Sequence, residues 1–177
     1  MRLDPPPLKK MLLVLWCLFF FQVLTDYSGK PFWVNLTESE PVGLYRMEKF
    51  NREIKRGDMV IMGIPKKFQS YAYGRKWLPK GWPLLKHVGA IPGDQFCFRD
   101  ATFLINGTPV GPVYPVDSQG LPLPHLEGCR EVPAGHFLPV ATGVKTSFDG
   151  RYMGPVLQSE IQGLVRPIWV FKVEGKP

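Results

Sequence analysis

Residues 84–94 read Leu-Leu-Lys-His-Val-Gly-Ala-Ile-Pro-Gly-Asp, a short apolar run followed by a turn sequence. Pro92-Gly93-Asp94 has the composition of a turn, which would end the strand that carries Lys86 and fix its direction. The chain contains further short apolar runs, each bounded by Gly, Pro or Asn; they cover 32–36, 59–64, 103–105, 137–140 and 164–173. Short runs with this punctuation predict a mainly β fold.

The segments between these runs carry local signals of their own. Residues 105–110 contain the pair Asn106-Gly107, which is typical of a tight β-hairpin turn. Residues 67–77 indicate either a short helix or an aromatic loop, and residues 155–162 indicate one helical turn. We therefore expect short helical segments beside the strands.

Length and composition limit the possible classes of protein. A chain of 177 residues is enough for one ordinary domain, and 45% apolar residues argue against intrinsic disorder. The net charge is +7, but the basic residues are scattered without a stripe, which argues against nucleic-acid binding. The sequence has no phosphate-binding loop and no dinucleotide fingerprint, so we expect no cofactor and no metal.

The first 27 residues predict a membrane-targeting segment. Met11 to Leu24 is an apolar run of 14 residues interrupted only by Gln22, and positive charges precede it at Arg2, Lys9 and Lys10. At ~1.5 Å per residue the run covers about 21 Å, so crossing a ~30 Å bilayer core needs the longer segment 8–25. That length also permits a signal peptide, or a buried core helix.

An uncleaved anchor is the favoured interpretation of this segment. Residues 25–30, Thr-Asp-Tyr-Ser-Gly-Lys, contain no good pair of small residues for a cleavage site. The distribution of positive charge then predicts a chain in the bacterial inner membrane, with a single β-rich domain over residues 28–177 in the periplasm.

The three cysteines fit that location. Cys17 lies inside the apolar run, which leaves Cys97 and Cys129 as the possible intradomain pair. An oxidising compartment favours a disulfide between them, with two free buried thiols as the alternative. A zinc site that combines them with His125 and His136 lacks the usual ligand spacing.

Three short motifs carry the chemistry. They are Ser39-Glu40-Pro41-Val42-Gly43-Leu44-Tyr45, then Lys86 to Asp94, then Ser147-Phe148-Asp149-Gly150-Arg151-Tyr152-Met153-Gly154. A Ser-His-Asp arrangement could use His87, His125 or His136, but the sequence has no Gly-x-Ser-x-Gly nucleophile elbow.

In their order and spacing these motifs resemble the type I signal peptidase superfamily, and within it the TraF-type peptidases of conjugative transfer. The resemblance covers almost all of residues 35–167. Ser39, Pro41, Gly43 and Tyr45 match the Ser-x-Pro-x-Gly-x-Tyr motif of that branch, in which a pair of cysteines also flanks an Ile-Asn-Gly hairpin. The resemblance implies a signal-peptidase-like β domain. Two departures from the wider family are Glu40, where a hydrophobic residue is usual, and Gly150, where a serine is usual.

The resemblance also implies roles for individual residues. Ser39 would be the nucleophile, Lys86 the general base, and Ser147 the hydroxyl that orients the lysine amine. Thr37 would take the position of a hydroxyl that assists the oxyanion. Asp149 and Arg151 would form a supporting ion pair.

The residues themselves agree with these roles without requiring them. A serine hydroxyl needs an adjacent base, and a lysine can be that base if burial disfavours its charge. Lys86 lies within an apolar run, where a surface lysine is unexpected, although strand alternation could still place it on a solvent-exposed face. Taken alone, Ser39 and Ser147 would each be ordinary turn residues.

The expected function is maturation of a membrane-inserted pilin precursor by acyl transfer. The resemblance implies that the enzyme trims the carboxyl end of the pilin, and that the pilin's own amino terminus can resolve the acyl-enzyme and close a ring. The alternatives are a general leader peptidase, an inactive periplasmic assembly module, and a self-cleaving repressor-type peptidase, which the predicted anchor disfavours. We expect the pilin precursor, the cytoplasmic membrane and the conjugative transfer machinery as partners.

Overall fold

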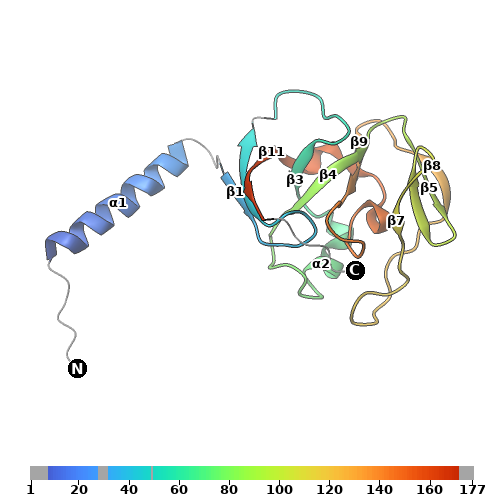
Figure 1. Ribbon diagram of the computed structural model, residues 1–177, viewed down its shortest axis with the longest axis horizontal. Helices are drawn as coiled ribbons and strands as arrows, with labels where there is room; N and C mark the ends of the chain where they lie inside the picture. The colour runs from blue at the N-terminus through green and yellow to red at the C-terminus, as the bar shows by residue number, and fades with distance from the viewer. Residues whose placement is uncertain (1–7, 28–31, 49, 172–177) are drawn as a thin grey trace.

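The structure is a computed structural model that describes residues 8–27, 32–48 and 50–171. Within these residues the chain forms two antiparallel sheets (Figure 1). The larger sheet has seven strands in the order β1-β2-β11-β3-β4-β9-β10, and the smaller has four in the order β7-β6-β5-β8. The mainly β fold predicted from the short apolar runs is therefore confirmed.

The strands are short except for the last. They are β1 Phe32–Asn35, β2 Gly43–Glu48, β3 Met59–Met62, β4 Leu84–Ala90, β5 Gln95–Arg99, β6 Thr102–Ile105, β7 Thr108–Pro112, β8 Gly128–Glu131, β9 His136–Val140, β10 Val156–Leu157 and β11 Ile161–Val170. The helical segments are α1 Leu8–Tyr27, η1 Lys66–Phe68, α2 Gln69–Ala72, α3 Gly150–Met153 and η2 Gln158–Glu160. The structure thus has helical turns within both 67–77 and 155–162, where the sequence predicts them, and an additional one at α3.

Strand β11 holds the larger sheet together. It lies between β2 and β3, which do not pair with each other, and its register shifts between Pro167 and Trp169. The N-terminal hairpin β1–β2 is therefore joined to the rest of the sheet through the last strand of the chain.

Two large apolar clusters fill most of the interior, beside a smaller one of Tyr45, Ile61, Leu85 and Val165. One packs the segment of η1 and α2 against the larger sheet and includes Phe68, Val60, Val88 and Phe137. The other lies where the two sheets meet and includes Ala90, Phe96, Phe103, Leu138 and Tyr152. On β4 the neighbours Leu85 and Lys86 are both buried, and from Lys86 to Ala90 buried and partly buried residues alternate.

The β6–β7 hairpin and the disulfide fix the smaller sheet. Asn106 and Gly107 both have positive φ, at 49° and 77°, which is the geometry that two-residue hairpin turns prefer. Cys97 of β5 and Cys129 of β8 are direct cross-strand partners with a Cα–Cα distance of 4.1 Å, and their sulfurs are bonded. The predicted disulfide is confirmed, and the alternative of two free thiols is wrong.

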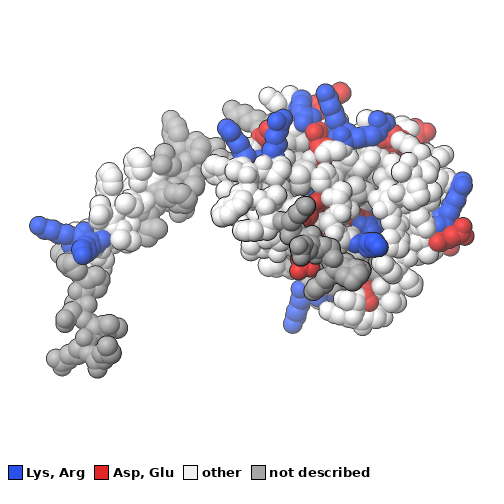
Figure 2. All heavy atoms as spheres, viewed as in Figure 1, with Lys and Arg blue, Asp and Glu red and all other residues white. Residues whose placement is uncertain are grey.

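Helix α1 carries positive charge at its first turn. Lys9 and Lys10 lie there, and the side chains of Met11 to Trp16 are exposed. Figure 2 shows Lys and Arg atoms in blue at this end of the helix, followed by uncharged atoms. Within the described parts of the chain, no helix is long and apolar enough to cross a membrane. Residues 1–7 and 28–31 of the predicted anchor and its junction lie outside the described residues.

Candidate active site

Lys86 lies in the middle of β4, an interior strand of the larger sheet. Strand β4 pairs with β3 on one side and with β9 on the other, and Lys86 stands opposite Val60. The side chain of Lys86 is only 1% exposed. The backbone ladders on both sides of β4 therefore fix the position of this lysine.

The amine of Lys86 is held by a second residue of the predicted site. Lys86 Nζ donates a hydrogen bond to Ser147 Oγ at 3.0 Å. Burial lowers the pKa of Lys86, and Arg151 acts in the same direction, whereas the carboxylates of Asp149 and Glu40 raise it. Because burial is the largest effect, the site favours the neutral amine, which is the form that can accept a proton.

A buried ion pair holds the loop that carries Ser147. Asp149 caps α3 by accepting a hydrogen bond from the Arg151 backbone N–H at 3.0 Å, and its carboxylate receives Arg151 Nε at 2.9 Å and Nη2 at 2.8 Å. Ala141 N–H donates to the same carboxylate at 2.8 Å, and Arg151 Nη1 donates to the Lys145 carbonyl at 2.5 Å. The ion pair thus closes the loop 141–149 around Ser147, which a solvated surface pair would not do.

Ser39 lies on the loop between β1 and β2, and Asn35 supports that loop from inside. Asn35 Nδ2 is within 2.9–3.1 Å of the carbonyl oxygens of Thr37, Glu40 and Pro41. Asn35 is 3% exposed, so its amide replaces water as the partner of these carbonyls. Side-chain hydrogen bonds, rather than a sheet ladder, set the shape of this loop.

The hydroxyl of Ser39 contacts Thr37. Thr37 Oγ1 donates to Asn35 Oδ1 at 2.8 Å and lies 3.4 Å from Ser39 Oγ. A threonine hydroxyl has one hydrogen, so Ser39 is the donor in the longer contact. The structure therefore places Thr37 beside the predicted nucleophile, two residues before it.

One cavity of about 700 Å³ brings the predicted polar residues together. Ser39, Thr37, Lys86 and Ser147 all line it, from three separate segments of the chain. Among the described residues, no hydrogen bond joins Ser39 Oγ to Lys86 Nζ. The structure thus places both residues at one cavity without direct contact between the two groups.

The apolar walls of this cavity were not predicted. They come from the segment after α2, with Trp77 and Leu78, and from the stretch 114–123, with Tyr114 and Val116. Arg75 ties these two segments together through Asp117 at 2.6 Å. The aromatic composition of 67–77 was a usable signal for the first wall, whereas nothing in the sequence of 114–123 marked the second.

The histidines lie elsewhere. His125 pairs with Glu127 at 3.1 Å, and His136 contacts the Ala134 carbonyl at 2.9 Å. His87 points away from Lys86 and lines a different, smaller cavity. Within the described residues no histidine lines the cavity of Ser39, so the geometry gives no support to a Ser-His-Asp arrangement there.

The structure explains one of the two departures from the family pattern. A Cβ atom on Gly150 would lie 2.6 Å from the Pro139 carbonyl oxygen and within 3.1 Å of the Leu138 side chain. A serine at this position would require the backbone of β9 or α3 to move. Gly150 therefore permits the close packing of α3 on β9.

Comparison with known proteins identifies the family. The family model described as "Signal peptidase, peptidase S26" matches residues 8–170. The chain belongs to this family. Its relatives include a conjugal transfer protein TraF from Agrobacterium fabrum, 38% identical over 147 residues, which are 78% of this chain and 82% of the relative. A plasmid transfer protein TraF from Escherichia coli is 33% identical over 145 residues, 76% of this chain and 81% of the relative.

These relatives make the chain a TraF-type member of the signal peptidase superfamily. A crystal structure of a signal peptidase I from Enterococcus faecalis aligns with a TM-score of 0.40 and 21% identity, covering 64% of this chain and 97% of that one.

Proposed function

We propose that the chain is a membrane-anchored Ser-Lys peptidase that matures a pilin precursor in conjugative transfer. The observation that carries the proposal is the environment of Lys86. Its amine is buried, hydrogen-bonded to Ser147 and placed on the same cavity as Ser39. Such an amine can serve as a base at lower pH than an exposed lysine, because burial lowers the pKa of Lys86.

Acylation would transfer one proton and exchange one covalent bond. The Lys86 amine takes the hydrogen of Ser39, and Ser39 Oγ attacks the carbonyl carbon of the scissile peptide bond. When the C–N bond breaks, the lysine ammonium returns that proton to the leaving amine. Rotation of the Ser39 hydroxyl from Thr37 toward Lys86 would start the sequence. To assist the oxyanion, Thr37 Oγ1 would have to turn its one hydrogen from Asn35 Oδ1 toward the substrate oxygen.

Deacylation determines the product. Attack of water on the Ser39 ester releases a linear pilin, whereas attack of the pilin's own amino terminus forms a peptide bond and closes a ring. Relatives named as conjugal and plasmid transfer proteins support placing the chain in conjugative transfer. The cyclising branch rests on the resemblance of the Ser39 motif alone.

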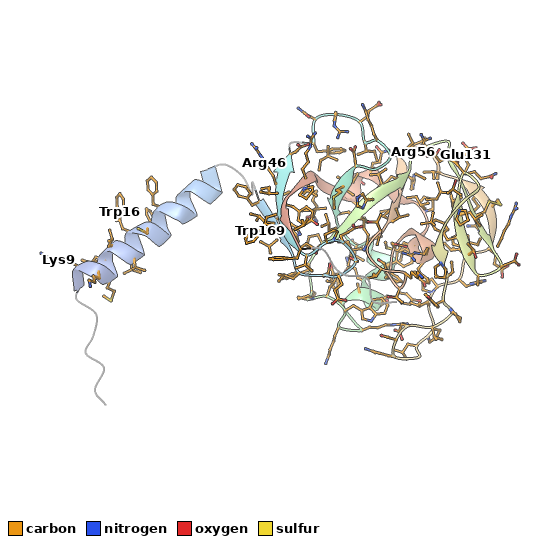
Figure 3. The ribbon with its side chains drawn as sticks, viewed as in Figure 1. Lys9, Trp16, Arg46, Arg56, Glu131 and Trp169 are labelled. Atoms are coloured by element: carbon orange, nitrogen blue, oxygen red, sulfur yellow. A yellow bond between two sulfur atoms is a disulfide. The ribbon has the colours of Figure 1, made fainter. Side chains whose placement is uncertain are left out.

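Membrane attachment is part of the proposal. The apolar run Met11 to Leu24 behind Lys9 and Lys10 supports an uncleaved anchor, with the β domain in the periplasm. Exposed apolar side chains near the N-terminal hairpin, Phe32 at 53% and Trp169 at 66%, add surface suited to a lipid interface. Figure 3 shows Trp169 on the side of the β domain toward α1.

The test uses the full chain in membrane vesicles. The pilin precursor encoded near the gene and a general exported preprotein are each incubated with wild-type, Ser39→Ala and Lys86→Met protein. Cleavage of the pilin alone, lost in both variants, is the expected result. Cleavage of both substrates would indicate a general leader peptidase, and unchanged processing in both variants would indicate an assembly module without this activity.

A truncated chain that lacks residues 1–27 separates the anchor from the chemistry. We expect it to cleave a soluble peptide at the wild-type rate but the membrane-inserted pilin far more slowly, since co-localisation raises the effective concentration. Equal rates on the membrane-bound pilin would contradict the proposed role of the anchor.

A further inference from the structure

Glu40 is a fully buried carboxylate that the proposed chemistry does not use. It is 0% exposed, and it stands where the family pattern has a hydrophobic residue. Burying a charge is costly unless hydrogen bonds compensate it. The identity of its partners therefore indicates why a carboxylate occupies this position.

The partners of Glu40 come from the two segments that carry Lys86 and Ser147. Glu40 Oε1 lies 3.0 Å from His87 Nδ1 and accepts from the Thr142 backbone N–H at 3.2 Å, while Oε2 accepts from Thr142 Oγ1 at 3.0 Å. His87 is the residue after Lys86 on β4, and Thr142 lies in the loop 141–149. With Glu40 ionised, the carboxylate can only accept, and His87 Nδ1 is then the donor of this contact.

The residue that follows Ser39 in the sequence therefore contacts the residue that follows Lys86. Ser39 and Lys86 face the large cavity, whereas the next residues in each segment, Glu40 and His87, contact each other away from it. On β4, adjacent side chains point to opposite faces, so His87 lies away from the cavity that Lys86 lines. The contact of Glu40 with His87 therefore ties the residue after Ser39 to the residue after Lys86. A further bond from Gly143 N–H to the Ser39 carbonyl, at 3.2 Å, strengthens the same junction.

We propose that Glu40 is a positioning residue that fastens the Ser39 loop to both β4 and the Ser147 loop, so that nucleophile, base and orienting hydroxyl keep a fixed geometry. This inference rests on the proposed function for its catalytic meaning. The junction itself does not, because it consists of contacts between described residues.

Glu40 also acts on Lys86 through its charge. The charged groups that influence the Lys86 amine are Glu40, Asp149 and Arg151, and the two carboxylates raise the pKa of Lys86 against the larger effect of burial. Removal of the Glu40 charge should lower that pKa further. A change in the pKa of Lys86 on substitution of Glu40 is an effect that a purely structural residue would not have.

The first experiment measures Lys86 directly and needs no substrate. Full-length protein with ¹³Cε-labelled lysine is titrated by NMR as wild type, Glu40→Gln and Glu131→Gln, the last being a control at an exposed residue of β8. We expect the Lys86 resonance to titrate at lower pH in Glu40→Gln only. An unchanged Lys86 titration in Glu40→Gln would overturn the electrostatic part of the proposal.

The second experiment measures acylation against pH. Glu40→Gln keeps an acceptor oxygen and the shape of the side chain, so we expect its acylation rate to rise at lower pH than in wild type, with a maximum within about tenfold. Glu40→Leu leaves three donors without a partner, and we expect its maximum to fall about a hundredfold through misplacement of Ser39. Wild-type acylation in Glu40→Leu would overturn the positioning role.

His87 provides a matched pair should Glu40→Leu fail to fold. His87→Asn retains an N–H donor close to Nδ1 and should preserve most of the acylation rate, whereas His87→Leu should lose it as Glu40→Leu does. Equal rates in the two His87 variants would also overturn the proposal. The results remain distinguishable from failure of the proposed function, which would appear as persistent cleavage in Ser39→Ala and Lys86→Met.

Discussion

Ser39 and Lys86 line one cavity, but the protein holds them in different ways. Lys86 lies on an interior strand whose backbone pairs on both sides, so its position depends on many main-chain hydrogen bonds. Ser39 lies on a loop whose shape depends on a few side chains, chiefly Asn35 and Glu40. The proposed base is therefore placed by the fold as a whole, whereas single substitutions can displace the proposed nucleophile.

The largest effect is expected from removing the base itself. Lys86→Met keeps the buried volume but cannot accept a proton, and we expect single-turnover acylation to fall about a thousandfold. In wild type the rate should rise with pH through an apparent pKa below that of a free lysine, since burial lowers the pKa of Lys86. Lys86→Arg should be equally inactive, because a guanidinium stays protonated.

The same substitution has a signature in stability. The unfolded state binds the lysine proton more tightly than the folded state, so the free energy of unfolding should rise with pH between the lowered folded-state pKa and the ordinary value. Lys86→Met should lack this rise in urea titrations at several pH values. Full activity in Lys86→Arg would refute the mechanism.

A smaller but still large loss should follow from one substitution in the Ser39 loop that leaves both reacting groups intact. Asn35→Ala removes the donor shared by three carbonyls, and we expect acylation to fall about a hundredfold and unfolding free energy to fall by ~1 to 3 kcal/mol. Asn51→Ala, at an exposed residue of the β2–β3 connection, is the control. An Asn35→Ala chain with wild-type acylation would mean that the loop keeps its shape without this side chain.

Ser147→Ala should have a smaller effect, because β4 still places the lysine. The amine loses one hydrogen bond, and the activation free energy of acylation should increase by ~1 to 3 kcal/mol. Exposed Ser159→Ala serves as the matched control in the same kinetic assay. A loss as severe as that of Lys86→Met would show that β4 alone does not position the Lys86 amine.

The disulfide should affect stability while leaving the rate nearly unchanged. Cys97 and Cys129 are 32 residues apart, and in the chain-entropy model a disulfide that closes a loop of that length stabilises the folded state by ~3 to 4 kcal/mol. Both cysteines lie on the smaller sheet, away from the cavity that Ser39 lines. Replacing both cysteines with serine should lower the free energy of unfolding, measured in urea, by this amount. A large fall in the acylation rate would contradict the prediction that the smaller sheet contributes to stability and not to the cavity of Ser39.

Lys86 is held by a paired strand and Ser39 by side-chain hydrogen bonds, and this difference also explains which elements could be predicted from the sequence. Interior strands such as β4 and β9 appear as apolar runs, and they were predicted within one or two residues. Strand β8 has only exposed residues and α3 has a single turn set by Asp149, so neither produces a periodic pattern. Local patterning identifies elements whose burial is strong, not those that depend on a capping side chain or on a partner strand.

The same limit applies to the candidate site. Ser39, Lys86 and Ser147 were found because short motifs surround them, and the structure brings them to one cavity. The function of Glu40 was not predicted, because its partners His87 and Thr142 lie 47 and 102 residues away in sequence. Contacts of that range depend on tertiary packing, which a single sequence does not encode in any local pattern.

The position of β11 has a consequence for when the cavity can form. The hairpin that supports Ser39 joins the sheet only through the last strand of the chain, so a nascent chain still emerging from the ribosome lacks the partner that docks its nucleophile loop. Pairing between segments this distant is slow and comes late in folding. The polypeptide should therefore remain latent until β11 has been synthesised, and a chain truncated before residue 161 should have Ser39 and Lys86 but no working arrangement of the two.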